Sequence, residues 1–215
     1  MKFMEKYRHF VWDFDGMLFD SYPHTARALY KTLRESGRDE PEDALYRALR
    51  VSIGHAFREY ALTDEEKLRF RAYENDLEAP PVTRPYPGIP ELLRKIVLRG
   101  GKNYLLTNRD GLAAVYLEKY GMRDSFALIV DSTFGFPSKP DPAGMRYLKE
   151  TCGFSGDALM LGDRELDALA GVGGGADALF FDEFRKVLPE NTAARYIVHS
   201  IEELASLILE GEIQA

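Results

Sequence analysis

The fold of this chain is limited above all by one short segment near its start, residues 10–18. The apolar run Phe10-Val11-Trp12 predicts a buried strand, and Gly16 lets the chain turn sharply at the carboxyl end of that strand. Two carboxylates, Asp13 and Asp15, stand between the strand and the glycine. In open α/β sheets, ligands bind at this end of the strands. Neighbouring carboxylates repel each other, so the pair calls for a cation, a shared proton or a basic partner, unless both acids are simply solvated.

The rest of the chain alternates between strand and helix patterns. Four further strands are expected where apolar or β-branched runs meet turn residues, at 103–107, 127–130, 158–161 and 178–181. Helices are expected over 89–97, 110–120, 141–152 and 200–209, with Asp110 and Asp141 as N-caps and a capping box at Ser200 and Glu203. This alternation predicts an α/β fold with a doubly wound, parallel, Rossmann-like sheet.

One stretch, residues 22–83, contains only helical patterns. They cover roughly 24–36, 41–50, 54–61 and 64–78, the last with a capping box at Thr63 and Glu66. A proline-rich connector over 79–88 cannot continue a helix. We therefore expect an α/β core of residues 1–20 and 84–215 and a small helical cap domain of residues 21–83. Inserted directly after the first strand, such a domain would serve as a lid.

Composition excludes several classes of protein. The net charge of −7 gives no sign of a nucleic-acid-binding face, and no apolar run is long enough to span a membrane. Charged residues interrupt the N-terminus, so no signal peptide is expected. The single cysteine, Cys152, rules out an internal disulfide and a cysteine-built metal site. A cytoplasmic protein is the expectation, and the oligomeric state is left open.

Three more polar sites lie at or near predicted strand ends. Thr107 and Asn108 follow the second strand and would hold a phosphate oxygen or simply form a turn. Lys139 stands between Ser138 and Pro140, where it has a defined direction or is an exposed surface lysine. Gly162-Asp163 repeats the pattern of the first strand, and Asp167 follows four residues later. Asp163 on its own would also serve as a helix cap.

Together these four sites resemble the motifs of the haloacid dehalogenase-like (HAD) superfamily in order, strand-end placement and spacing, over residues 10–181. The inserted helices are similar to the cap of its phosphoglycolate phosphatase-like branch. The resemblance implies a Mg²⁺-dependent phosphatase. Its substrate would be a small phosphorylated metabolite such as phosphoglycolate, a sugar phosphate or a nucleotide.

The resemblance also assigns the acidic residues. It makes Asp13 the nucleophile, which forms an aspartyl-phosphate, and Asp15 the general acid and then the general base. It places Mg²⁺ on the Asp13 carboxylate, the Asp15 backbone carbonyl and the Asp163 carboxylate, a set of oxygen ligands that suits this ion.

The remaining site residues stabilise charge in this scheme. Thr107 and the backbone N–H of Asn108 would hold a phosphoryl oxygen. Lys139 would neutralise Asp13 and the phosphate, and Asp167 would orient the metal shell or Lys139. Phosphoryl transfer needs positioning and charge stabilisation above all, and these residue types supply both.

Other readings remain open. Sugar phosphate mutases of the same superfamily often carry a histidine where Thr25 stands, and His24 is one residue off. Dehalogenases proper lack the second aspartate of the first motif, and the family often has threonine where Met17 stands. A protein with this fold that only binds a phosphorylated ligand is a third reading.

Several side chains are left out of the expected site. His24 and His55 are taken as ordinary packed or exposed histidines. Arg58 and Arg109 are expected to be solvated. The glycines of residues 171–175 are expected to form a flexible connection between a helix and a strand.

Overall fold

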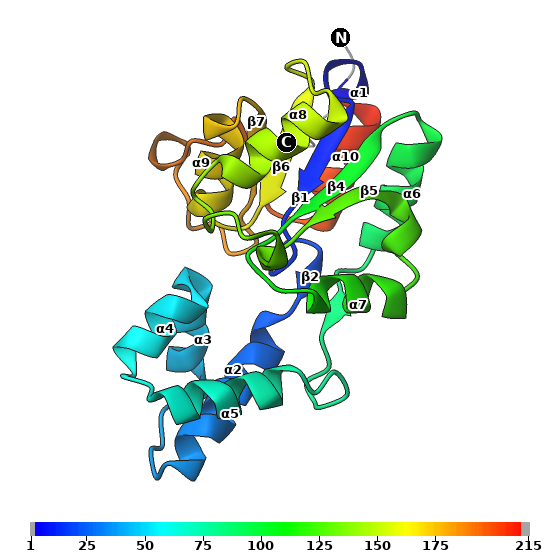
Figure 1. Cartoon of the computed structure of the whole chain (residues 1–215). Helices are drawn as coiled ribbons and strands as arrows, with labels where there is room; N and C mark the ends of the chain where they lie inside the picture. The colour runs from blue at the N-terminus through cyan, green and yellow to red at the C-terminus, as the bar shows by residue number, and fades with distance from the viewer. Residues whose placement is uncertain (1–2, 212–215) are drawn as a thin grey trace. The chain divides into compact units, whose positions relative to one another are not determined.

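The computed structural model describes residues 3–211 (Figure 1). By its internal contacts the chain divides into two compact units. One consists of Met1–Leu18 and Pro85–Ala215, and the other of Phe19–Arg84. Among the helices of residues 3–211, none is both long and apolar enough to cross a membrane.

The first unit is built on a six-stranded sheet in the order β5-β4-β1-β6-β7-β8, in which every neighbouring pair is parallel. The strands are β1 (His9–Trp12), β4 (Lys102–Leu106), β5 (Phe126–Val130), β6 (Ala158–Gly162), β7 (Asp177–Phe181) and β8 (Tyr196–Val198). All five residues of β6 are buried, as expected of a central strand covered on both faces. The predicted α/β fold with a parallel sheet is confirmed.

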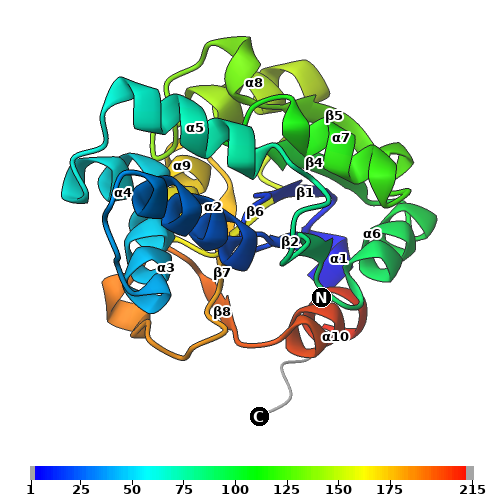
Figure 2. The ribbon, with the colours of Figure 1, turned by 90° about the horizontal axis from the view of Figure 1, so that it is seen from below.

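Helices cover both faces of this sheet. They are α1 (Phe3–Lys6), α6 (Ile89–Leu98), α7 (Leu112–Lys119), α8 (Ala143–Cys152), α9 (Glu165–Gly173) and α10 (Ile201–Glu210), with 3₁₀ turns at η1 (Arg123–Ser125), η2 (Ser132–Phe134) and η3 (Pro189–Asn191). Figure 2 shows α8 and α9 on one face and α6 and α10 on the other. A core cluster joins Val11 and Met160 of the sheet to Met145 of α8 and Ala168 of α9.

The structure differs from the predicted elements at the two ends of the chain. Neither α1 nor β8 was expected, because a four-residue helix and a three-residue edge strand are too short to leave a periodic pattern. The Ser200 hydroxyl accepts the N–H of Glu203, as predicted. The Glu203 carboxylate, however, accepts the N–H of His199 at 2.6 Å. In the predicted capping box this carboxylate would accept the N–H of Ser200, so the hydrogen bond is made to the preceding residue instead.

The glycines of residues 171–175 lie partly within α9, which ends at Gly173, and partly in the turn that precedes β7, where Gly174 and Gly175 stand. A Cβ on Gly171 would lie 2.5 Å from Met160 Cβ, and one on Gly174 would lie 2.4 Å from Met145 Cγ. Real Cβ atoms do not approach so closely, so these glycines allow α9 to pack directly against β6 and α8. The predicted connection between a helix and a strand is therefore present at Gly174 and Gly175. The close packing was not predicted, because it cannot be read from a local run of glycines.

The second unit is a group of four helices, α2 (Tyr22–Glu35), α3 (Glu42–Val51), α4 (Ile53–Glu59) and α5 (Asp64–Glu74). Helix α2 packs against α3 and α5. Their core contains Leu29, Leu33 and Phe70, which are all fully buried. The capping box of Thr63 and Glu66 forms as predicted, but α5 ends at Glu74 and not at residue 78.

A two-stranded ribbon joins the ends of this helical segment. It pairs β2 (Phe19–Asp20) with β3 (Arg84–Pro85). Next to it, the Tyr86 N–H donates to the carbonyl of Leu18 at 3.0 Å. The chain therefore leaves the sheet unit and returns to it at neighbouring points. The role of the helical unit as a cap stays a prediction.

Candidate functional site

The central strands bring distant parts of the sequence to one edge of the sheet. Strand β1 lies between β4 and β6, and all three run in the same direction. The residues that follow them, Asp13, Thr107 and Asp163, therefore gather at the carboxyl edge. Asp13 also donates its N–H to Leu161 O at 2.8 Å, which extends the strand pairing up to the site.

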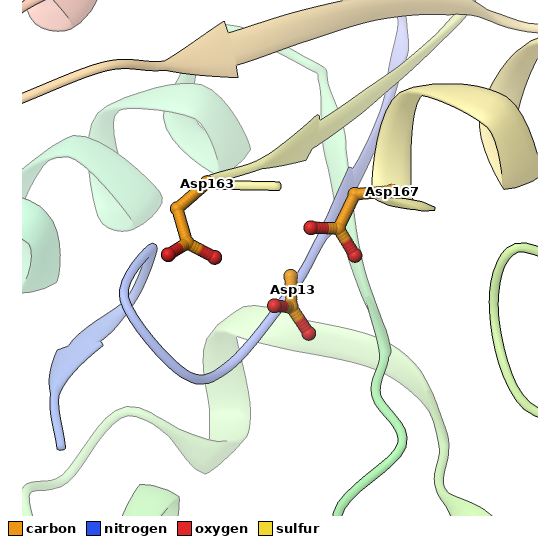
Figure 3. A group of neighbouring side chains, drawn as sticks. All are labelled: Asp13, Asp163 and Asp167. Carbon is orange, nitrogen blue, oxygen red and sulfur yellow. The ribbon is translucent and has the colours of Figure 1, made fainter. Parts of the chain in front are cut away.

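Three buried carboxylates form the centre of this edge (Figure 3). Asp13, Asp163 and Asp167 each offer an oxygen, and these oxygens all lie within 4.8 Å of one another. Asp167 comes from the first turn of α9. It reaches the cluster because residue 162 is glycine, since a Cβ there would lie 2.3 Å from Asp167 Cβ.

Lys139 bridges two of these acids. Its ammonium Nζ lies 2.6 Å from Asp13 Oδ1 and 2.6 Å from Asp167 Oδ1, and it donates to the carbonyl of Leu106 at 3.0 Å. Burial alone would lower the pKa of Lys139, but the two carboxylates outweigh it and the pKa is raised. The lysine is therefore a buried cation and not the exposed surface residue of the alternative reading.

The cluster keeps an excess of negative charge. Burial and the nearby Asp167 raise the pKa of Asp13 above its ordinary value, although Lys139 and Arg164 act to lower it. Asp13 Oδ2 is buried and accepts no hydrogen bond from the described part of the chain. Three clustered carboxylates suit a hard divalent cation, which takes oxygen ligands. The residues present therefore fit a divalent metal ion.

Asn108 holds the Lys139 loop in place. Its side-chain oxygen accepts the Lys139 N–H at 2.9 Å, and its amide group donates to the Lys139 carbonyl at 3.4 Å. The predicted role of Asn108 used only its backbone N–H. Thr107 is 5% exposed, and its hydroxyl accepts the N–H of Arg109 at 3.1 Å.

Asp15 lies beside a cation that sequence reasoning set aside. The Arg109 guanidinium contacts the Asp15 carboxylate through Nε at 3.2 Å and through Nη2 at 2.8 Å. Its Cζ lies 5.4 Å from the centre of the Phe14 ring. The Arg109 side chain is only 8% exposed, so the expectation of a solvated arginine was wrong. Its place directly after Thr107-Asn108, in the loop that follows the strand next to β1, was the signal that could have identified it.

Arg164 is a second cation that sequence reasoning missed. It follows Asp163 directly, and its guanidinium lies 3.5 Å from Asp13 Oδ2 and 3.6 Å from Asp163 Oδ1. Its backbone N–H donates to Asp167 Oδ2 at 3.2 Å. Its position beside a predicted metal ligand was the available signal.

In the helical unit, the histidine next to the mutase position has an internal role. The Nε2 atom of His24 lies 3.0 Å from Glu74 O, and its Nδ1 lies 3.2 Å from Ala79 O. The side chain therefore ties the end of α5 and the following turn to α2. Thr25 donates its hydroxyl to Ser21 O at 3.1 Å, a contact within the first turn of α2.

The chain is similar to several known proteins. A family model described as haloacid dehalogenase-like hydrolase matches residues 7–175. A phosphoglycolate phosphatase of Rhodospirillum rubrum is 31% identical over 176 residues, which cover 73% of this chain and 72% of that one. A phosphoglycolate phosphatase of Aquifex aeolicus is 33% identical over 171 residues, or 76% and 79% of the two chains. The crystal structure of a hydrolase from Streptococcus pneumoniae has 32% identity and a TM-score of 0.61, and the match covers 80% of this chain and 91% of that one.

Proposed function

This chain belongs to the haloacid dehalogenase-like hydrolase family, and we propose that it is a Mg²⁺-dependent phosphatase that cleaves a small phosphomonoester through an aspartyl-phosphate on Asp13. The observation that carries the proposal is the buried Lys139 ammonium, 2.6 Å from both Asp13 and Asp167, beside the third carboxylate of Asp163. Burying these charges is explained by the binding of a phosphate group or a metal ion. For packing alone, apolar side chains would be more stable in the same place.

In the first step, an Asp13 carboxylate oxygen attacks phosphorus in line with the leaving oxygen. The new O–P bond forms as the bond to the leaving oxygen breaks, and Asp15 donates a proton to that oxygen. Lys139 offsets the charge of Asp13 and of the phosphoryl group. Mg²⁺, when held by Asp13, the Asp15 carbonyl and Asp163, supplies further neutralisation of the phosphoryl oxygens.

In the second step, water attacks phosphorus and the O–P bond to Asp13 breaks. Asp15, now a carboxylate, takes the proton from the water, and phosphate leaves while Asp13 returns to its starting form. The Thr107 hydroxyl and the Asn108 N–H would donate to phosphoryl oxygens in both steps. Arg109, in contact with Asp15, orients the group that moves both protons.

The substrate class follows from the relatives. Since the similar curated proteins are phosphoglycolate phosphatases, phosphoglycolate is the first candidate, followed by sugar phosphates and nucleotides. A small phosphorylated metabolite of the cytoplasm fits this proposal.

The test is phosphate release from a panel of these esters, with Mg²⁺ and with EDTA. We expect turnover that needs Mg²⁺ and that falls by a factor of about 10³ or more in Asp13→Asn. Asp124→Asn, a matched change at an exposed position, should keep the wild-type rate. Conversion of glucose 1-phosphate to glucose 6-phosphate without phosphate release would favour the mutase reading. Absence of any turnover would favour a binding protein.

A further inference from the structure

A guanidinium lies beside two of the carboxylates that are expected to hold a metal ion. The Arg164 guanidinium lies 3.5 Å from Asp13 Oδ2 and 3.6 Å from Asp163 Oδ1, and the side chain is 17% exposed. We propose that Arg164 is a resident counter-ion of this site. It neutralises Asp13 and Asp163 in the metal-free protein and withdraws when a divalent cation binds, so it sets the affinity for the metal. The inference rests on the proposed function only in requiring that the site take a divalent cation.

The two cations of the site face different oxygens. Lys139 pairs with Asp13 Oδ1 and Asp167 Oδ1 at 2.6 Å each. Arg164 instead faces the other oxygen of Asp13 together with Asp163 Oδ1, at the longer distances given above. Asp13 and Asp163 are the two side chains assigned to the metal. The guanidinium therefore competes for the metal's own ligands, whereas the ammonium does not take the place of the metal.

The geometry lets the Arg164 side chain move while its backbone stays fixed. The backbone N–H donates to Asp167 Oδ2 at 3.2 Å, which anchors the start of α9. The side chain is long and reaches solvent in part, so the guanidinium has a route away from the acids. Its separations from Asp13 and Asp163 exceed those of a close charged hydrogen bond, for which about 2.8 Å is typical.

Charge explains why the guanidinium and the metal exclude each other. Three carboxylates and two cations leave the cluster with an excess of negative charge. A divalent ion on Asp13 and Asp163 would stand within a few ångströms of the guanidinium, and like charges at that separation repel strongly where water is scarce. Removing Arg164 should therefore have two opposite effects. The metal-free protein loses a counter-ion and becomes less stable, while the affinity for metal increases.

Isothermal titration with MgCl₂ and thermal unfolding in EDTA and in Mg²⁺ test this inference without relying on activity. For Arg164→Met we expect the Kd for Mg²⁺ to fall about tenfold or more, a lower Tm in EDTA, and a larger rise of Tm on adding Mg²⁺. Arg164→Gln provides a second neutral variant that keeps hydrogen-bond donors, and Arg164→Lys should stay close to the wild type because it keeps the charge. Arg146→Met is the matched control, since it removes an exposed guanidinium that donates to the carbonyl of Gly173 and touches none of the residues assigned to the metal. Its Kd should stay within about twofold of the wild type.

An unchanged or higher Kd in both neutral variants would overturn the role of Arg164, and so would a tenfold fall in the Arg146 control. If Arg164→Met and Arg164→Gln bind Mg²⁺ and the wild type does not, the proposal is supported, because Arg164 is then the group that excludes the ion. The proposed function fails separately if the wild type shows no Mg²⁺-dependent turnover. Binding of Mg²⁺ by the wild type with no gain in the variants would remove only this inference.

Discussion

The ion pair between Lys139 and Asp167 makes a prediction about stability that can be measured without a substrate. In Lys139→Met, Asp13 and Asp167 stay buried but lose the positive charge of Lys139. Removing one partner of a buried ion pair lowers the free energy of unfolding by about 3–5 kcal/mol. Asp167→Asn should cost less, because Lys139 then still pairs with Asp13. In the double variant, the neutral asparagine also removes the repulsion between the two acids. The two changes should therefore be coupled by about 2 kcal/mol or more.

The assay is urea unfolding in EDTA at pH 7, followed by the fluorescence of Trp12, the only tryptophan of the chain. Trp12 is fully buried in β1 directly before Asp13, so it reports on the sheet unit. Lys95 and Glu91 provide a matched cycle, since they form an ion pair at 2.8 Å on the surface of α6, with side chains 47% and 61% exposed. Their coupling should stay below about 0.5 kcal/mol. Additive effects of Lys139→Met and Asp167→Asn, within about 0.5 kcal/mol, would refute the buried bridge.

Three further predictions follow from single contacts. Arg109→Met should lower kcat/KM for an alkyl phosphate about tenfold more than for p-nitrophenyl phosphate, because the nitrophenolate leaving group needs no proton from Asp15. Equal losses of kcat/KM for the two esters would contradict the role of Arg109 in orienting Asp15. Gly162→Ala should displace Asp167 and lower both Tm and turnover, whereas Gly111→Ala, where nothing lies within 4 Å of the added Cβ, should leave both unchanged. The Ser36 hydroxyl, the Thr63 N–H and Arg38 hold the pKa of Glu66 down at about 2, so its stabilising effect is complete above its ordinary pKa of 4.5 and is lost as the pH falls toward 2. In urea unfolding at pH 7, Glu66→Gln should therefore have a lower free energy of unfolding than the wild type. This difference should become smaller below pH 4.5. A difference that stays the same at all pH values would exclude the ionised carboxylate as its cause.

The sequence predicted those parts of the fold and site that depend on local patterns. Strand-end acids at Asp13 and Asp163 are visible because an apolar run, a carboxylate and a glycine stand together. Parallel strands then bring such ends to one edge, whatever lies between them in the chain. The same reasoning found Lys139, whose proline neighbours gave it a defined direction.

The partners of these acids were harder to predict. Arg109 and Arg164 each stand directly after a predicted site residue, but that position alone does not show which acid an arginine pairs with. The strand order places them beside Asp15 and Asp13. The close packing of the glycines after residue 170 was not predicted for a related reason. Their small size matters only against Met160 and Met145, which are brought there by the packing of separate elements.

The central position of β1 has a consequence for how the chain acquires its site. Within residues 3–211, strand β1 pairs with β4 on one side and β6 on the other, and His9 lies opposite Lys102 and Ala158. During synthesis, Asp13 is made early, whereas Asp163 is made about 150 residues later. Contacts so distant in sequence form late and slowly, because long loops must close before they are stabilised. The cluster of Asp13, Asp163 and Asp167 therefore assembles only after β6 has been made and has paired with β1, and a chain that ends before residue 163 lacks the cluster.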